Sequence, residues 1–422
     1  MINCQLKLYK DDILNIFKEQ NINYDKVYYY LILVFAFLLP LSRAAVSLFI
    51  LLLPVVWLIE GNIQEKFLHI WKNNLLKSIL LFLLFMISSL LWSSDISNGL
   101  HFLRLYSYWF AIFVIATSIK KEYIQSFITS FLFGMFLSEL IAYGVFFEIW
   151  TFKAATPVNP SPFMFWIDYS VFMAVTSILL LSRLFSKNYK LKEKMFMLVF
   201  FLSTTVNLFL GMGRTGQVAL IAGIIVMVFL YLKPNIKSFF IGIFLIIGIY
   251  GAGYTISETF QNRVNAGITD IQSMQNNKFD TSWGIRVVYW MITYDILKDN
   301  PMIGVGVGDY KDSINNYLQK NKYPISKETE EFIREHHAHN QFLMIAIQTG
   351  FIGLILMLNI LYQILRIKID DEDVKYFSIL FITVYFVSCM AEPLWAKQFT
   401  IALYVLFIGL FSSYSINIKS KI

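Results

Sequence analysis

The chain alternates between long apolar runs and short polar stretches, a pattern that predicts α-helices crossing a bilayer. A helix needs about 20 predominantly apolar residues to span the hydrocarbon core, and the apolar runs in this sequence are close to that length. About twelve transmembrane helices are therefore expected. They cover roughly residues 27–42, 44–59, 76–93, 102–118, 125–149, 162–182, 195–212, 216–232, 238–255, 341–365, 375–391 and 398–414.

The composition agrees with a membrane protein and argues against a soluble one. Of the 422 residues, 57% are hydrophobic and only 15% are charged, so a soluble fold would lack the polar surface to cover its apolar runs. The aromatic content of 17% is also typical, because Phe faces lipid while Trp and Tyr settle near the membrane interface. The two cysteines, Cys4 and Cys389, imply no disulfide framework. We predict an all-α polytopic membrane protein.

Basic residues are concentrated in alternate loops, and this bias orients the predicted helices. With twelve spans both termini lie on one side, and the loops of that side hold most of the lysines and arginines, as cytoplasmic loops do. The net charge of +7 is explained by topology, so no nucleic-acid partner is expected. Residues 1–26 show no cleavage pattern after the first apolar run, which indicates a retained cytoplasmic tail.

The predicted topology divides the chain into five parts. They are a cytoplasmic tail (1–26), transmembrane helices 1–9 (27–255), a periplasmic loop domain between spans 9 and 10 (256–340), transmembrane helices 10–12 (341–414) and a second cytoplasmic tail (415–422). The turns at 211–217 and 391–398 share the outer face with the long loop. Because that loop is small for an independent domain, we expect it to pack on the helix bundle.

The long loop is itself expected to be helical. Residues 284–301 have the pattern of an amphipathic helix that ends at Pro301. The glycine-rich turn GVGVGDY, residues 304–310, follows and leads into a polar helix from about 309 to 320. A third short helix is expected from Ser326, because acidic residues in its first turn complement the helix dipole.

Two arginines in the outer segments are candidate ligands for an anion. Arg214 lies in the outer turn GMGRTGQ, where the orienting bias disfavours cations and the neighbouring glycines leave the backbone open to approach. Arg286 lies near the start of the amphipathic loop helix. A planar guanidinium matches the oxygens of a phosphate. The alternatives are a snorkelling side chain for Arg214 and a surface residue for Arg286.

Three of the five histidines, His336, His337 and His339, fall within four positions before span 10. They could be solvated surface groups, zinc ligands or a catalytic base. His336 and His339 would share a helix face, but no further zinc ligands suggest themselves and the HExxH pattern is absent. A neutral imidazole suits proton removal near neutral pH. Gly350 and Gly353 would share a helix stripe with His339, where a neighbouring helix could approach closely.

Other ionisable residues are weaker candidates. Asp168 lies within span 6, where a charge is costly and usually faces the protein interior, so it has either a supporting role in the site or a structural one. His101 and Arg104, near an outer helix end, belong either to the same site or to the membrane interface. The acidic run DDED at 370–373 resembles a metal-nucleotide motif of soluble glycosyltransferases. We interpret it as solvated, because it lies in a predicted cytoplasmic loop.

These features together resemble the O-antigen ligases, polytopic enzymes that attach O-polysaccharide to the lipid A core. His339 and Asn340, followed by Gly350 and Gly353, fit the H-[NSQ]-x9-G-x-x-G pattern of that family. The family's second pattern, R-x3-L, is approximated by the segment that begins at Arg214, with Val in place of Leu. The stretch IRVVYWMITYDILKDNPMIGVGVGDY also looks like the segment before the histidine in the wider ligase and polymerase superfamily.

The resemblance implies specific roles for the candidate residues. Arg214 and Arg286 would bind the diphosphate of an undecaprenyl-linked O-polysaccharide, the donor, while His339 or His337 would deprotonate the accepting sugar hydroxyl of lipid A-core. Supporting positions would be Asn340, Gly350, Gly353 and Asp168. The resemblance further implies a GT-C-like fold, inversion at the anomeric carbon, and no metal or other cofactor. The expected location is the inner membrane of a Gram-negative bacterium, with the active site facing the periplasm.

Two other functions stay open at this point. An O-antigen polymerase would use the same donor and join it to a second lipid-linked repeat. A transporter of lipid-linked glycans would share the twelve spans and the outer arginines. The histidine and glycine pattern favours the ligase over the polymerase. Transporters often have two related halves, whereas this chain concentrates its polar residues in one outer loop.

Overall fold

The computed structural model describes residues 22–416. These residues are helical apart from turns, links and one isolated bridge between Thr156 and Asn159. Ten helical segments in this range are long and apolar enough to cross a membrane. The prediction of an all-α polytopic membrane protein is confirmed. Most of the tail expected at 1–26, and residues 417–422 of the second tail, lie outside the described residues.

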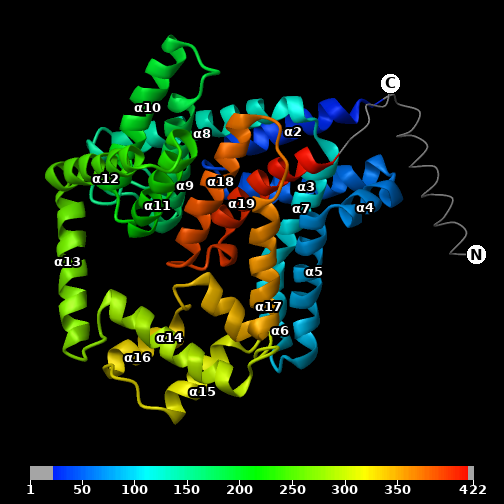
Figure 1. The fold of residues 1–422 in the computed structure, drawn as a ribbon. Helices are drawn as coiled ribbons and strands as arrows, with labels where there is room; N and C mark the ends of the chain where they lie inside the picture. Colours follow the sequence, from blue (N-terminus) through cyan, green and yellow to red (C-terminus); the bar gives the residue numbers. More distant parts are fainter. Residues whose placement is uncertain (1–21, 417–422) are drawn as a thin grey trace, which may run out of the picture.

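The helices follow the chain from α2 to α19, with short 3-10 turns between some of them (Figure 1). Their bounds are α2 (Tyr24–Leu38), α3 (Arg43–Glu60), α4 (Ile63–Lys72), α5 (Asn74–Ser88), α6 (Ile96–Tyr106), α7 (Phe110–Ser118), α8 (Ile124–Phe146), α9 (Trp166–Phe185), α10 (Leu191–Leu210), α11 (Arg214–Leu232), α12 (Ile236–Ile256), α13 (Glu258–Gln275), α14 (Ser282–Asp299), α15 (Tyr310–Lys320), α16 (Lys327–Glu335), α17 (Gln341–Leu365), α18 (Glu372–Cys389) and α19 (Gln398–Ser412).

Two of the twelve predicted spans are not among these ten segments. The helix α2, at the first predicted span, is only 15 residues long. The helix α18, at the eleventh, carries Glu372, Asp373 and Lys375 near its start. Both are helices at the predicted places, but one is shorter and the other more polar than a typical span.

The centre of the bundle contains α9, α11, α18 and α19. In α9 and in the span that contains α19, 89% of the apolar window is buried, whereas α12, with 11% buried, lies at the periphery. Aromatic rings fill the centre. Phe407 of α19 packs against Phe377 and Phe381 of α18, with ring centroids 5.1 and 4.9 Å apart.

The segments predicted to be cytoplasmic meet at one end of the bundle, which we call the basic end. Lys120, between α7 and α8, pairs with Asp25 of α2 at 2.8 Å. Lys121 beside it pairs at 3.6 Å with Asp370, in the link between α17 and α18. These ion pairs join loops that are distant in sequence and that the charge pattern assigns to one side.

The segments predicted to be periplasmic meet at the opposite end, which we call the histidine end; it includes residues 257–340 and the turn 390–397. Helices α14, α15 and α16 lie together at the lower edge of the view, and α13 connects them to α12 (Figure 1). The carboxylate of Asp309 accepts hydrogen bonds from the backbone N–H groups of Ser94 and Asp95, each at 2.8 Å. The long loop therefore packs on the ends of the membrane helices.

Three of the four helices in this loop correspond to the predicted ones. The helix α14 begins after Thr281, whose hydroxyl accepts from the N–H of Gly284, and α16 begins after the capping residue Ser326. The helix α13 was not expected, because most of its residues are polar and it contains no continuous apolar run. The helix α4 at the basic end was not expected either, because its five apolar residues are interrupted by polar ones and form no run long enough for a membrane span.

The helix α17 is broken at Gly350, where φ is 63° and ψ is −160°. The turn 301–306 fills the break. The N–H groups of Val305 and Gly306 donate to two α17 carbonyls before the break, both at 2.9 Å. Two carbonyls of the turn accept from α17 N–H groups after it, at 2.9 and 3.1 Å. The glycine-rich segment therefore satisfies backbone groups that the break would leave unpaired in the membrane.

The expected helix stripe of His339, Gly350 and Gly353 is wrong. His339 precedes α17, and Gly350 interrupts the helix, so the three residues do not share one regular face. A Cβ atom at position 350 would lie 2.5 Å from the backbone of Met302. Because Gly350 has no side chain, the turn 301–306 can pack against it; the element that approaches is this turn and not a neighbouring helix.

Candidate active site

His339 lies in the link between α16 and α17, and the neighbouring Asn340 fixes the backbone there. The Asn340 Oδ1 accepts hydrogen bonds from the N–H groups of Phe342 and Leu343 at 2.8 and 3.2 Å, which caps α17. Its Nδ2 donates to the carbonyl of Met390 at 3.0 Å. One side chain therefore holds the start of α17 against the end of α18, with His339 beside it.

A buried carboxylate holds the His339 ring. Nδ1 of His339 lies 3.0 Å from Oε1 of Glu392, and the side chains are 27% and 3% exposed, respectively. Oε2 of Glu392 lies 3.0 Å from Nζ of Lys397, which in turn lies 3.4 Å from Oδ1 of Asp168. Asp168 is therefore connected to His339 through two further charged groups.

The charged groups connected to His339 determine which of its ring nitrogens carries the proton. Burial alone would raise the pKa of the Glu392 carboxyl, but its hydrogen bond with His339 and the charge of Lys397 hold that pKa below its usual value. Burial would lower the pKa of Lys397, yet the carboxylates of Asp168 and Glu392 keep it above its usual value. Because an ionised carboxylate only accepts hydrogen bonds, Nδ1 of His339 donates to Glu392, and in the neutral ring this leaves the lone pair on Nε2.

His337 lies next to this group but has different neighbours. It is open to solvent on one side, and its ring centroid lies 6.3 Å from that of Phe102 and 6.5 Å from that of Tyr310. Desolvation by the surrounding protein, followed by the effects of His339 and Lys397, lowers the pKa of His337. We expect this imidazole to stay neutral at neutral pH.

His336 faces away from this group. It is exposed and stacks on Phe332, with ring centroids 3.9 Å apart, and its Nδ1 lies 2.8 Å from the Phe332 carbonyl oxygen. The prediction that His336 and His339 share a helix face is wrong, because both lie in the link after α16. Within residues 22–416, no group of three or more His, Cys, Asp or Glu side chains is arranged to hold a metal ion.

Three arginines from different helices meet at the histidine end. Arg214 is the first residue of α11, Arg263 lies on α13 and Arg286 on α14. The charges of Arg263, Asp270 and Arg286 all act on the Arg214 guanidinium, so these groups lie within electrostatic range of it. Nη1 of Arg214 and Nε of Arg286 are buried without a hydrogen-bond partner in the described part of the chain. Buried cationic donors of this kind are costly unless an anion satisfies them.

The arginine cluster and His339 lie at the same end of the molecule, and the charge of Glu392, which pairs with His339, also acts on Arg286. Burial lowers the pKa of Arg286, and the carboxylates of Glu392 and Asp270 act in the opposite direction. Nη1 of Arg286 donates to the carbonyl of Ser282 at 3.0 Å, while its Nε has no hydrogen-bond partner in the described residues. The structure therefore brings Arg214, Arg286, His337, His339 and Asp168 to the same end of the molecule.

The remaining candidates form no ion pair or side-chain hydrogen bond with this group within residues 22–416. His101 and Arg104 are exposed on α6, and neither forms an ion pair within residues 22–416. The acidic run 370–373 lies at the basic end, where Asp371 caps α18 and Asp373 accepts a hydrogen bond from Ser186 at 2.9 Å. Those carboxylates have structural partners and are distant from the histidines.

Three members of the site were not singled out in the sequence. Glu392 and Lys397 lie in the turn 390–397, and Arg263 lies on the unpredicted helix α13. The available signal was the presence of two ionisable residues in a short outer turn. Nothing local indicates that Glu392 is buried or that it faces a histidine more than fifty residues away, because packing of α17 against α18 creates that contact.

The fold and the site define a polytopic helical membrane protein with a carboxylate-paired histidine beside an arginine cluster at one end. Residues 198–358 match the family model described as O-antigen ligase, and this supports the O-antigen ligase family assignment that the motifs indicated. The matched segment contains the three arginines and the three clustered histidines. Asp168, Glu392 and Lys397 lie outside it. A comparison with curated proteins found no match.

Proposed function

We propose that this protein is an O-antigen ligase, which transfers O-polysaccharide from undecaprenyl diphosphate to a sugar hydroxyl of lipid A-core on the periplasmic side of the inner membrane. The family match over residues 198–358 supports an enzyme of the O-antigen ligase and polymerase type. The reaction proceeds with inversion and without a metal ion. The observation that carries the proposal is the pairing of His339 with the buried Glu392 at 3.0 Å, at the same end of the molecule as the buried, unpartnered guanidinium nitrogens of Arg214 and Arg286.

The arginine cluster binds the donor diphosphate. Two carboxylates, Asp270 and Glu392, act on the three arginines, and Glu392 is already paired with Lys397. Positive charge is therefore in excess at the cluster. A diphosphate linked at both ends carries two negative charges, which matches this excess. The buried Nη1 of Arg214 and Nε of Arg286 then find phosphate oxygens as acceptors. Fixed cations also stabilise the charge that develops on the leaving diphosphate, and loss of one such donor costs about 10² to 10³ in rate.

His339 activates the acceptor. The sugar hydroxyl gives its proton to Nε2 of His339 as its oxygen attacks the anomeric carbon of the donor sugar. The bond between that carbon and the diphosphate oxygen breaks, and its electron pair leaves with the diphosphate. Attack from the face opposite the leaving group inverts the anomeric centre. A positioned base of this kind contributes roughly 10² to 10⁴ in rate.

Glu392 supports this proton transfer through Nδ1, the other ring nitrogen of His339. It accepts from Nδ1 of His339, which fixes the tautomer and the ring orientation, and its charge stabilises the imidazolium that forms. Lys397 and Asp168 hold the carboxylate in place from the side away from the histidine. His337 lines the same region without a carboxylate partner of its own, so it serves acceptor binding better than proton removal.

The test is the substitution His339→Ala in cells that make O-polysaccharide, with His336→Ala as the matched control. We expect His339→Ala to abolish polysaccharide on the lipid A core while lipid-linked polymer accumulates. His336→Ala should behave as wild type, because that ring stacks on Phe332 outside the site. Gel analysis of lipopolysaccharide and of extracted lipid-linked glycan measures both pools. Cores capped with single repeats in the His339→Ala strain would instead identify a polymerase.

A further inference from the structure

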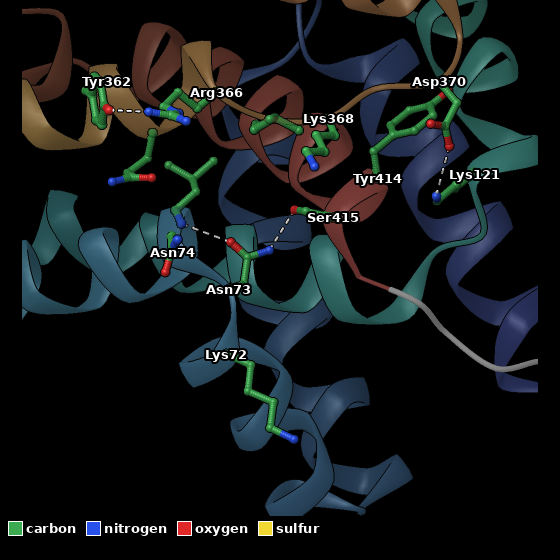
Figure 2. Close-up of a pocket in the computed structure, with 13 residues that line it drawn as sticks. Lys72, Asn73, Asn74, Lys121, Tyr362, Arg366, Lys368, Asp370, Tyr414 and Ser415 are labelled. Carbon is green, nitrogen blue, oxygen red and sulfur yellow. Dashed lines mark hydrogen bonds and ion pairs between the residues drawn. The ribbon is translucent and has the colours of Figure 1, made fainter.

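A separate cavity lies at the basic end, far from the histidines (Figure 2). It has a volume of about 720 Å³ and lies among the ends of α4, α5, α17 and α19. The 25 residues of α17 separate it from His339, a distance comparable to the thickness of a membrane. Its chemistry is therefore independent of the proposed glycosyl transfer.

Four cationic side chains line this cavity and one carboxylate opposes them. Lys72 ends α4, Lys121 lies just before α8, and Arg366 and Lys368 follow α17. Asp370 pairs with Lys121 at 3.6 Å. Within residues 22–416, Lys72, Arg366 and Lys368 form no ion pair with a carboxylate. The cavity therefore holds an excess of positive charge.

Aromatic side chains contact two of these cations, Arg366 and Lys121. Nη1 of Arg366 donates to the hydroxyl of Tyr362 at 2.5 Å, and its guanidinium carbon lies 5.5 Å from the centre of that ring. Nζ of Lys121 lies 5.4 Å from the centre of the Tyr414 ring. Such contacts orient a cation without neutralising it. Figure 2 shows Lys368 between Arg366 and Tyr414, from where its ammonium reaches the open space.

The helix α4 places the cavity at the membrane surface. Its exposed side chains include Ile63, Phe67, Leu68 and Trp71, and the rings of Phe67 and Trp71 stack with centroids 6.4 Å apart. A short helix with an exposed apolar face, followed directly by Lys72, is typical of a helix lying in the membrane interface. The cavity thus adjoins the layer that contains lipid headgroups.

We propose that this cavity binds the phosphate-bearing headgroup of an anionic membrane lipid. Arg366, Lys368 and the hydrogen-bonding side chains around them recognise the phosphate, while the acyl chains lie along the exposed faces of α4 and α17. The basic end is the side that the charge pattern assigns to the cytoplasm, and basic pockets between membrane helices on that side suit anionic headgroups. A bound lipid would also contact α5, α17 and α19 together, and these helices extend from the basic end toward the histidine end.

The test is native mass spectrometry of the purified full chain with added phosphatidylglycerol, phosphatidylethanolamine or inorganic phosphate. We expect retained phosphatidylglycerol adducts and weaker phosphatidylethanolamine adducts. The variant Arg366→Gln/Lys368→Gln should bind phosphatidylglycerol about 30-fold more weakly, because each cation near a headgroup contributes roughly a fivefold factor. The control Lys187→Gln/Lys237→Gln removes two exposed lysines at the same end but outside the cavity, and should bind as wild type.

Two results would overturn the proposal. One is equal phosphatidylglycerol binding by both double variants. The other is binding of inorganic phosphate as tight as that of the lipid, which would identify a free anion as the ligand. The single variant Lys368→Glu provides a second measurement if the double variant unfolds, because Lys368 is exposed and has no ion-pair partner in the described chain. It should lose lipid adducts while its thermal unfolding matches wild type.

Discussion

Nδ1 of His339 and Oε1 of Glu392 lie 3.0 Å apart, with the carboxylate almost fully buried and the imidazole partly exposed. The geometry leaves Nε2 free to take a proton, so the activity should depend on Glu392 although this residue does not touch the substrate. We expect Glu392→Gln to lower the transfer rate roughly 10² to 10⁴-fold, because an amide cannot stabilise the imidazolium and can donate to Nδ1, which moves the ring proton to Nε2. Transfer between purified donor and lipid A-core in proteoliposomes measures the rate.

The control for this substitution is Glu335→Gln, which removes an exposed carboxylate from the end of α16 near the same link. It should retain the wild-type rate. Glu392→Asp keeps the charge but shortens the side chain, so it should recover part of the rate lost in Glu392→Gln. Full activity of Glu392→Gln would remove the proposed positioning role.

The pKa of Glu392 also predicts how stability depends on pH. Its folded pKa lies below the ordinary value of 4.5, so the folded state binds this proton more weakly than the unfolded state does. The ionised Glu392 therefore stabilises the folded state. This contribution is fully present at pH values above the unfolded pKa, and it is lost as the pH falls through the folded pKa. The difference in Tm between wild type and Glu392→Gln should therefore be largest at neutral pH and shrink below about pH 4.5. Thermal unfolding in detergent across this range tests the trend, and a difference that grows toward acid pH would contradict it.

Lysine substitutions in the arginine cluster separate the effect of the positive charge from the effect of the planar guanidinium. Arg214→Lys and Arg286→Lys each keep a positive charge but lose the planar fork that binds two phosphate oxygens. We expect each to lower the rate by about 10² to 10³. Arg263→Lys should also reduce the rate, which would establish that α13 contributes to the donor site. Steady-state rates with varied donor measure the effects.

The matched control for the arginines is Arg104→Lys, at an exposed position on α6 without an ion pair in the described chain. Its rate should equal that of wild type. Lys variants of Arg214 and Arg286 with unchanged rates would mean that neither guanidinium binds the diphosphate through paired hydrogen bonds.

The fold was largely predictable because membrane helices carry a strong local signal. Long apolar runs and the bias of lysine and arginine between alternate loops are sufficient to place the helices and to group their ends. The helices that escaped prediction, α4 and α13, contain no apolar run long enough for a membrane span, so the signal that marks the other helices is missing. The break at Gly350 could not be foreseen, since it depends on the turn 301–306 that fills it.

Candidate site residues could be predicted only where a residue type is unusual for its position in the sequence. Arg214 stands out because a cation in an outer turn opposes the orienting bias, and His339 because it belongs to a dense cluster. Glu392 gives no such signal, since carboxylates are common in turns. Its role arises from burial between the ends of α17 and α18, and that burial is a property of tertiary packing.

The break in α17 predicts that a side chain at Gly350 destabilises the protein. At Gly350 the positive φ of 63° disfavours any side chain, and a Cβ would lie 2.5 Å from the Met302 backbone. Gly350→Ala should therefore destabilise the protein by about 1 to 3 kcal/mol and separate the turn 301–306 from α17. Gly251→Ala is the control, because a Cβ there meets open space in the regular helix α12, and it should be neutral or stabilising by roughly 0.5 to 1 kcal/mol. Thermal unfolding of both variants in detergent measures the difference, and equal stabilities would mean that α17 can close its break without the turn.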